Sequence, residues 1–299
     1  RCLVGSEMCI RDRFNGISLG SVYAIIALGY TMVYGIAKML NFAHGDVIMI
    51  GGYVLFSMIY GSGTNVFAAL IVAMVVCTVL GVVIEKVAYK PLREASSLAV
   101  LITAIGVSIL LQNIAQLIFT SQPKMFRNPI KLGSVKMFGA NIEGSTILMI
   151  VLGIIIVVAL SIFIRKTKTG RAMLAVSEDK DAAKLMGINV NTTITITFAI
   201  GSALAALASL LMFNAYPSLI PTSGSMPGIK AFVAAVFGGI GSIPGAMVGG
   251  IVLGIIEVLS GAYIPNGTKL ANAIVFVVLI VVLIFKPTGL FGKKIKEKV

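Results

Sequence analysis

The sequence predicts an all-α polytopic membrane protein with about eight to nine transmembrane helices, some broken or re-entrant, and a short helix on the cytoplasmic side. Hydrophobic residues make up 58% of the 299 residues and charged residues only 12%, whereas a water-soluble domain carries roughly 45–50% apolar and about 25% charged residues. The charges also cluster between long stretches without any charge, which cover residues 14–37, 47–84, 95–123, 188–229 and 231–256. This pattern excludes an ordinary soluble globule and a disordered chain.

Several of these charge-free stretches are long enough for more than one crossing, because a transmembrane helix needs only about 20 mostly apolar residues. We expect crossings at residues 17–37, 45–60, 66–87, 95–119, 145–164, 192–213, 246–262 and 270–285. A shorter apolar piece at 231–240 cannot span the hydrocarbon alone. We interpret it as a half-helix or re-entrant segment, which is tolerated at membrane depth only where it packs against protein.

The two ends of the chain differ from the rest in composition. Residues 1–13 carry five charged residues and two cysteines, and we expect them to be a non-native leader. Residues 14–292 form the predicted transmembrane domain, which includes a cytoplasmic loop at 165–191, and residues 293–299 form a basic cytoplasmic tail.

Basic residues between the crossings set the expected orientation, since cytoplasmic loops carry an excess of Lys and Arg. They assign residues 86–93, 165–171 and 286–298 to the inside. The connection 121–144 also holds four basic residues, yet must lie outside. In addition, the last two inside segments need an even number of crossings between them, and three are clear. Either 231–240 extends into a crossing or the seventh span is bent.

The net charge of +13 follows from this orientation bias. Nucleic-acid binding is not indicated, because the sequence has no basic stripe interleaved with aromatic residues. A single histidine excludes a His-Glu-x-x-His zinc site, and no Gly-x4-Gly-Lys-Ser/Thr phosphate loop occurs. No Ser or Cys has a nearby base in a recognisable arrangement. We therefore expect a protein that is not an enzyme and has no metal or cofactor of its own; if ATP drives it, another polypeptide supplies the ATPase.

The loop at 165–191 runs from a basic segment into an acidic one and then into small apolar residues. Ser177, which two acidic residues follow, is the predicted N-cap of a short helix, and Gly187 is its predicted end. The helix would present a small apolar surface formed by Ala182, Ala183, Leu185 and Met186. Such a surface in a charged loop favours docking onto a partner; a solvated amphipathic loop is the alternative.

Two sets of residues resemble a known family. Asp181-Ala182-Ala183-x3-Gly187 resembles the Glu-Ala-Ala-x3-Gly loop of bacterial ABC-importer permeases, with Asp in place of Glu and without the Ile-x-Leu-Pro that often follows. Residues 15–24, 29–36 and 41–46 (Asn-Phe-Ala-His-Gly-Asp), together with 170–172, 187–189 and 237–246, are similar to the LivH type of branched-chain amino acid permease. The resemblance covers roughly residues 14–291. Urea and short-chain amide permeases share much of it.

The resemblance implies a multi-pass subunit of the bacterial inner membrane with a cytoplasmic C-terminus. It implies a second permease subunit in a heterodimer, two cytoplasmic ATPase subunits that hold ATP and Mg, and a periplasmic substrate-binding protein. The segment 165–191 would be the coupling loop of a permease domain that carries Leu, Ile or Val. Its coupling helix, which in that family sits in a cleft of the ATPase, would comprise Asp181, Ala182, Ala183, Leu185, Met186 and Gly187.

Polar residues at membrane depth are the candidates for the translocation path. Asn41, His44 and Asp46 lie at a break between two predicted crossings. A structural role is favoured, because such side chains satisfy the freed backbone groups of a broken helix; a substrate or gating role is the alternative.

Glu257 lies within an apolar segment, where insertion scales put an ionised carboxylate at roughly 2.5–3.5 kcal/mol. We expect it to face protein or water, on the path or at a subunit interface. Glu85 is interpreted as an interfacial residue beside Lys86, and Lys230 is expected to extend its charge outward.

The main rival to an ATP-driven permease is a secondary transporter or channel that works without an ATPase. It explains the hydropathy equally well but leaves the helix of residues 181–187 without a purpose. An intramembrane enzyme is disfavoured by the single histidine and by the lack of a nucleophile with its base.

Overall fold

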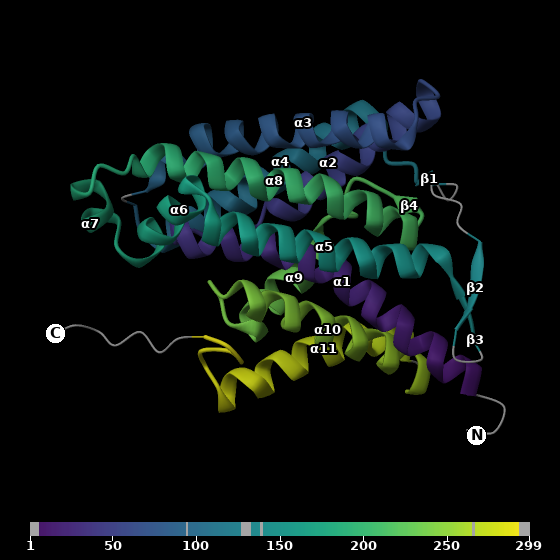
Figure 1. The fold of residues 1–299 in the computed structure, drawn as a ribbon. Helices are drawn as coiled ribbons and strands as arrows, with labels where there is room; N and C mark the ends of the chain where they lie inside the picture. The colour runs from purple at the N-terminus through teal and green to yellow at the C-terminus, as the bar shows by residue number, and fades with distance from the viewer. Residues whose placement is uncertain (1–5, 94, 127–132, 138–139, 265–266, 293–299) are drawn as a thin grey trace. The chain divides into compact units, whose positions relative to one another are not determined.

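The computed structural model describes residues 6–93, 95–126, 133–137, 140–264 and 267–292 (Figure 1). Its helices are α1 (Ser6–Ala37), α2 (His44–Phe56), α3 (Val66–Ile84), α4 (Ser97–Phe119), α5 (Gly144–Lys166), α6 (Lys168–Glu178), α7 (Lys180–Leu185), α8 (Val190–Ala215), α9 (Ser225–Gly238), α10 (Ile243–Tyr263) and α11 (Gly267–Phe285). Irregular turns extend α2 (η1, Ser57–Gly61) and α3 (η2, Glu85–Tyr89; η3, Lys90–Leu92). The predicted all-α polytopic class is confirmed.

Four short strands, which the sequence analysis did not predict, lie in the connections. Strands β2 (Ser134–Met137) and β3 (Ala140–Glu143) form an antiparallel hairpin. Strand β1 (Lys124–Met125) pairs antiparallel with β4 (Ser218–Leu219). This pairing joins the connection that follows α4 to the connection that follows α8. Both pairs lie outside the long apolar helices.

Six helical segments among the described residues are long and apolar enough to cross a membrane: Glu7–Ala37, Val66–Leu92, Ser97–Phe119, Gly144–Lys166, Val190–Ala215 and Ile243–Tyr263. They match six of the eight predicted crossings. The predicted crossing at 45–60 is α2 with its irregular extension, and α2 itself has only 13 residues. The predicted crossing at 270–285 falls within α11, and the half-helix predicted at 231–240 belongs to α9, which begins at Ser225. The six long helices and these three shorter ones agree with the expected eight to nine elements.

The turn between α9 and α10 concerns the sequence prediction that an even number of crossings separates the basic segments 165–171 and 286–298. Gly239 and Gly241 have φ of +104° and +90°, values that favour glycine, and they let the chain reverse. The amides of Leu290 and Phe291, which follow α11, donate to the carbonyls of Phe237 and Gly238 at the end of α9. The carboxyl ends of α9 and α11 thus lie together, because α10 and α11 form a pair of elements that returns the chain to the end of α9.

The described residues belong to two compact units, and their boundaries run through α1, α5 and α9. Unit 1 is drawn from Arg1–Leu28, Lys131–Val157 and Lys230–Val299, and unit 2 from Gly29–Ile130 and Val158–Ile229. The helix that covers residues 6–37 begins eleven residues before the predicted crossing at 17. The assignment of 1–13 as a leader stays a prediction, and the basic tail at 293–299 lies outside the described residues.

Unit 1 is held by close packing of α1 against α10. A Cβ atom on Gly20 would lie 2.6 Å from the Cα of Ile251 and 2.8 Å from its carbonyl oxygen. Gly250 and Gly254 of α10 lie equally close to the backbone of α1. Glycine is needed at this crossing because only a hydrogen side chain lets the two backbones approach, and such packing is a main source of helix association in lipid.

Unit 2 packs around α2, which contacts α3, α4 and α8. Gly51 of α2 lies against Ser209 of α8, and Gly81 of α3 lies against Ser202 of α8. Helix α3 presents an outward apolar stripe at four-residue spacing, formed by Phe67, Ile71, Val75, Val79 and Val83, each 49–78% exposed. A continuous apolar face of this kind fits contact with lipid.

Candidate functional site

The predicted cytoplasmic loop folds into α6 and α7, which are separated at Asp179. The Asp179 carboxylate accepts hydrogen bonds from the amides of Asp181 and Ala182, at 2.9 and 3.0 Å, and so caps α7. The prediction that Ser177 is the cap was wrong. Ser177 lies in the last turn of α6, where its hydroxyl donates to the Leu174 carbonyl, and a residue two positions later takes the capping role.

The other end of α7 stops at Gly187, as predicted. Gly187 has φ of +81°; its amide donates to the carbonyl of Lys184, and the amide of Ile188 donates to the carbonyl of Ala183, both at 3.0 Å. This pair of bonds is a Schellman motif, whose left-handed residue is usually glycine. The short helix therefore has a defined cap at both ends.

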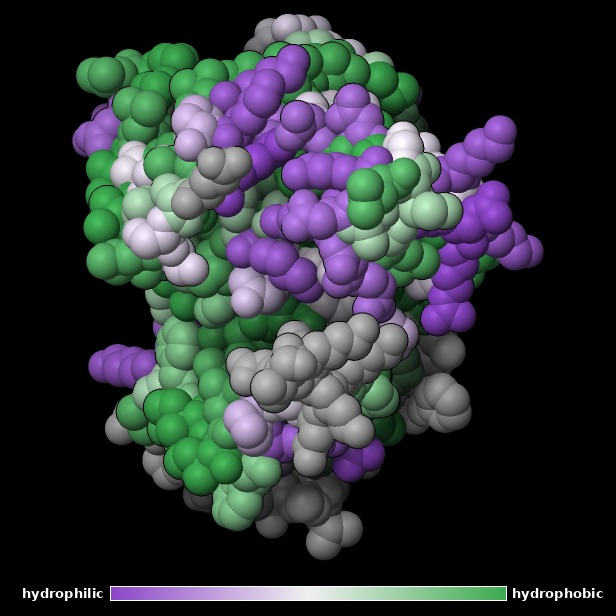
Figure 2. All heavy atoms as spheres, turned by 90° about the vertical axis from the view of Figure 1, so that its left-hand side faces the viewer, coloured by the Kyte–Doolittle hydropathy of each residue, from purple (hydrophilic) through white to green (hydrophobic). Residues whose placement is uncertain are grey.

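Helix α7 presents part of the predicted apolar surface. Leu185 and Met186 are 89% and 82% exposed, and Ala182 is exposed beside them. Ala183 does not contribute, because it is only 3% exposed and faces the protein. Figure 2 views the end at which α6 and α7 lie, where hydrophilic side chains gather around smaller hydrophobic patches. Two large apolar side chains in such surroundings fit contact with another protein.

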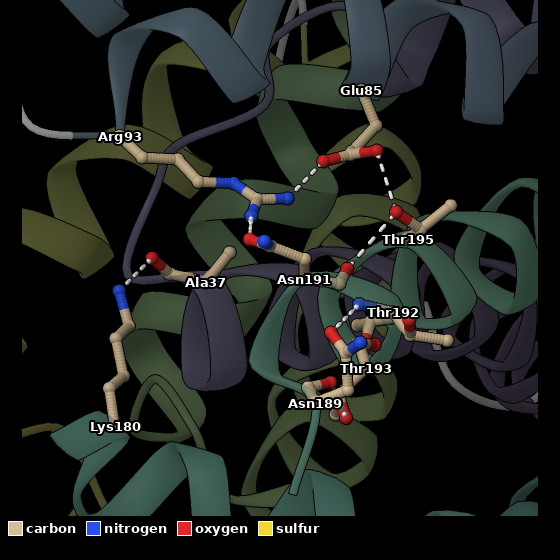
Figure 3. A network of polar contacts seen from close by, with 10 residues as sticks. Ala37, Glu85, Arg93, Lys180, Asn189, Asn191, Thr192, Thr193 and Thr195 are labelled. Carbon is tan, nitrogen blue, oxygen red and sulfur yellow. Dashed lines mark hydrogen bonds and ion pairs between the residues drawn. The ribbon is translucent and has the colours of Figure 1, made fainter. Parts of the chain in front are cut away.

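Lys180 ties the start of α7 to the end of α1. Its ammonium donates to the carbonyl of Ala37 at 2.9 Å, which satisfies a carbonyl at a helix carboxyl terminus (Figure 3). Partial burial, together with the nearby charges of Arg93, Lys38 and Lys184, lowers the pKa of the Lys180 ammonium below its ordinary value. Displacement of α7 would therefore act directly on α1.

A second polar network lies beside this tether, where the irregular turns that extend α3 meet the start of α8 (Figure 3). Arg93 donates to the carboxylate of Glu85 and to the side-chain oxygen of Asn191. Thr195 donates to the other oxygen of Glu85 at 2.8 Å. The interpretation of Glu85 as interfacial stays a prediction, but the side chain is not exposed beside Lys86: it is 0% exposed, because Arg93 and Thr195 of α8 contact it. Asn191 lies in the first turn of α8, which begins at Val190. Asn189 caps this helix, because its side-chain oxygen accepts from the amide of Thr192.

The side chains of the three residues predicted at the break between α1 and α2 have different partners, although the amide of His44 donates to the carbonyl of Asn41 at 3.2 Å. Asn41 accepts from the hydroxyl of Tyr89 at 2.9 Å. His44 lies edge-on to Tyr30 with ring centroids 4.9 Å apart, and a Cβ on Gly29 would lie 2.6 Å from its Cε1. The structure thus buries both Asn41 and His44, and each has a tyrosine beside its side chain.

Asp46 has a polar network of its own, which sequence reasoning missed. It is 1% exposed and accepts from the hydroxyl of Ser108 and, at 3.0 Å, from the side-chain amide of Gln112. Gln112 also donates to Ser225 at 3.0 Å, so the network joins α2, α4 and the start of α9. The available signal was the four-residue spacing of Ser108 and Gln112 in a charge-free stretch, which puts both on one helix face.

Glu257 is paired within unit 1. Its carboxylate accepts from Lys230 at 2.6 Å and from the hydroxyl of Tyr23 at 2.9 Å. Lys230 does not extend outward as expected, since the residue is only 7% exposed. Glu257 faces protein, as predicted. Among the described residues, no three His, Cys, Asp or Glu side chains gather as a metal site would require.

Comparisons with known proteins agree with the sequence motifs. The family model described as branched-chain amino acid transport system / permease component matches residues 13–283. The chain is 45% identical to the high-affinity branched-chain amino acid transport system permease protein LivH of Salmonella typhimurium, covering 97% of each chain. It is 43% identical to BraD of Pseudomonas aeruginosa, covering 97% of this chain and 98% of the relative.

Among solved structures, PsaBC from Streptococcus pneumoniae in complex with Fab matches with a TM-score of 0.48 and 15% identity, covering 96% of this chain and 95% of that one. The sequence relationships are far closer, and the matched family model spans nearly the whole apolar part of the chain. This chain therefore belongs to the family of branched-chain amino acid transport permease components, and resembles its LivH and BraD members.

Proposed function

We propose that this chain is the permease subunit of an ATP-binding-cassette importer that carries Leu, Ile and Val across the bacterial inner membrane, driven by separate ATPase subunits. The substrate class rests on the relatives, whose names describe high-affinity branched-chain amino acid transport. The energy source rests on α7, a capped helix with two exposed apolar side chains in a charged loop. That surface is the observation that carries the proposal.

In the proposed mechanism, α7 docks onto an ATPase subunit through Leu185 and Met186. ATP binding closes the two ATPases and moves α7, and the Lys180 tether passes that motion to the end of α1. The tether and the Asn189 cap join α7 to α1 and α8, so a displacement of a few ångströms reaches two long helices. The permease pair then changes between outward-facing and inward-facing states, while ATP and Mg stay on the partner subunits.

The proposed assembly contains a second permease subunit as a heterodimer, two cytoplasmic ATPases and a periplasmic substrate-binding protein, in a lipid membrane. The α6–α7 end faces the cytoplasm in this proposal, as does the C-terminus. Exposed basic residues support this side, since cytoplasmic loops favour Lys and Arg: Lys38, Lys86, Lys90, Arg165, Lys166, Lys168 and Arg171.

The docking step is tested by Leu185→Asp and Met186→Asp. Burial of each side chain in the partner would contribute about 1.5–3 kcal/mol, so each variant should weaken ATPase binding by about tenfold or more and reduce leucine uptake. The matched control is Met125→Asp, which changes another exposed apolar residue at β1, at the opposite end of unit 2 from α7 (Figure 1). All variants should still insert into the membrane.

Co-purification of the ATPase and uptake of radiolabelled leucine, valine and urea measure the outcome. Unchanged uptake in both α7 variants would refute the docking step and favour a secondary transporter. Uptake of urea or a short-chain amide in place of leucine would refute the substrate assignment while leaving the energy source intact.

A further inference from the structure

Unit 1 carries a compact set of three polar side chains from three helices. Lys230 of α9 lies 2.6 Å from one carboxylate oxygen of Glu257 of α10, and the Tyr23 hydroxyl of α1 lies 2.9 Å from the other. Lys230 is also 3.4 Å from that hydroxyl and 5.8 Å from the centre of the Tyr23 ring. Each pair within the set is thus in contact.

These charges are isolated in an apolar environment. Within residues 14–28 and 230–264, Lys230 and Glu257 are the only charged residues. Intramembrane ionisable residues are costly and as a rule serve a function. A buried ion pair is weak evidence for a stabilising role, because replacing such a pair by well-packed apolar groups is often neutral or stabilising. The glycine-lined crossing of α1 and α10 already holds two of the three helices together.

The ion pair is complementary to a particular class of ligand. The backbone groups of a free amino acid are one ammonium and one carboxylate, and they can exchange partners with Lys230 and Glu257 without any charge being left unpaired. Both side chains retain a small exposure, 9% for Lys230 and 13% for Glu257. The Tyr23 hydroxyl contacts both ions and would hold them while the pair opens.

We propose that Lys230, Glu257 and Tyr23 form a transport subsite for the charged backbone of a zwitterionic amino acid. Lys230 binds the carboxylate, Glu257 binds the ammonium, and the direct ion pair re-forms when the substrate leaves. This inference rests on the proposed function for its cargo and adds the residues that recognise it. An anion alone would leave Glu257 unpaired, and a neutral urea or amide would leave the ion pair closed, so the subsite selects zwitterions.

The test measures binding of radiolabelled leucine to the permease assembled with its second permease subunit and ATPases in lipid nanodiscs, with the binding protein omitted. The competitors are leucine, leucinamide, which lacks the carboxylate, and 4-methylpentanoate, which lacks the ammonium. For the wild-type protein, each analogue should compete about tenfold or more weakly than leucine, since each forfeits one charge-assisted hydrogen bond.

Two single variants should each abolish a different half of this discrimination. In Lys230→Met, leucine binding falls about tenfold and leucinamide competes as well as leucine, because the carboxylate no longer has a partner. In Glu257→Gln, leucine binding falls in the same way and 4-methylpentanoate competes as well as leucine, because the ammonium no longer has a partner. The controls are Lys269→Met and Glu143→Gln, which make similar changes at exposed positions of unit 1 and should keep the wild-type pattern.

The subsite is refuted if wild type binds no leucine, if it does not discriminate against the analogues, or if the variants weaken all three ligands equally. Should a single variant fail to assemble, the Lys230→Met/Glu257→Leu double variant takes its place, because it leaves no unpaired charge. Retained leucine binding by that protein overturns the inference. Leucine uptake by the complete wild-type system is measured in parallel: its absence overturns the proposed function, whereas uptake with unchanged discrimination in the variants overturns the subsite alone.

Discussion

Removal of one member of the Glu85–Arg93 ion pair should destabilise the protein more than removal of both. The Glu85 side chain is 0% exposed and that of Arg93 is 16% exposed. Removing one partner of a buried pair costs about 3–5 kcal/mol. We expect about 2–3 kcal/mol for Glu85→Leu, because the partly exposed guanidinium regains some hydration. The Glu85→Leu/Arg93→Met variant leaves neither charge, and Asn191, which is exposed, recovers its hydrogen bond from water.

The measurement is thermal unfolding of the purified protein in detergent. Since 1 kcal/mol shifts Tm by roughly 2–4 °C in a chain of 150–250 residues, Glu85→Leu should lower Tm by about 4–12 °C and the double variant by about 2 °C or less. Thr195→Val removes one hydrogen bond to Glu85 and should give an intermediate loss. A double variant that is as unstable as Glu85→Leu would contradict the reasoning, because it would mean that the intact pair is itself a net source of stability.

Three further outcomes follow from local geometry. Gly187→Ala should destabilise the loop by about 1 kcal/mol because of its φ of +81°, whereas Gly187→Asn should be better tolerated; amide hydrogen exchange in α7 measures both. Gly20→Ala should lower Tm by the equivalent of about 1–3 kcal/mol, since its Cβ would lie 2.6 Å from the Cα of Ile251; Gly106→Ala, which meets no atom within 4 Å, should not. Because burial lowers the pKa of Lys180, its neutral amine exists at lower pH, so acylation followed by mass spectrometry should have its half-point below that of a lysine model peptide. A half-point at or above that of the peptide would contradict the assignment.

Hydropathy alone located the membrane helices well. Predicted crossings such as 66–87 and 192–213 match the long apolar segments Val66–Leu92 and Val190–Ala215. They could be predicted because a spanning helix satisfies its backbone within one continuous segment, so the signal is local. The strands β1 and β4 could not, because Lys124 and Leu219 pair across 95 positions of the chain and neither segment has more than two residues.

The coupling loop was predictable in outline but not in detail. Gly187 ends α7 as expected, because a left-handed C-terminal residue has a strong local preference for glycine. The start was misassigned, because Ser177 and Asp179 are both good N-caps and the sequence does not say where α6 ends. Ala183 was expected at the surface, but its face of a six-residue helix is decided by what the loop packs against.

The amino-acid sequence by itself was sufficient to predict the membrane class, the approximate spans, the short helix with its terminal glycine, and the family resemblance. All of these depend on composition or on residues close together in the chain. The partners of the buried charges came only from the folded structure: Glu85 with Thr195, 110 positions away, and Glu257 with Tyr23, 234 positions away. A charge removed from water must find a partner in space, and helix packing brings distant residues together in ways that hydropathy does not encode.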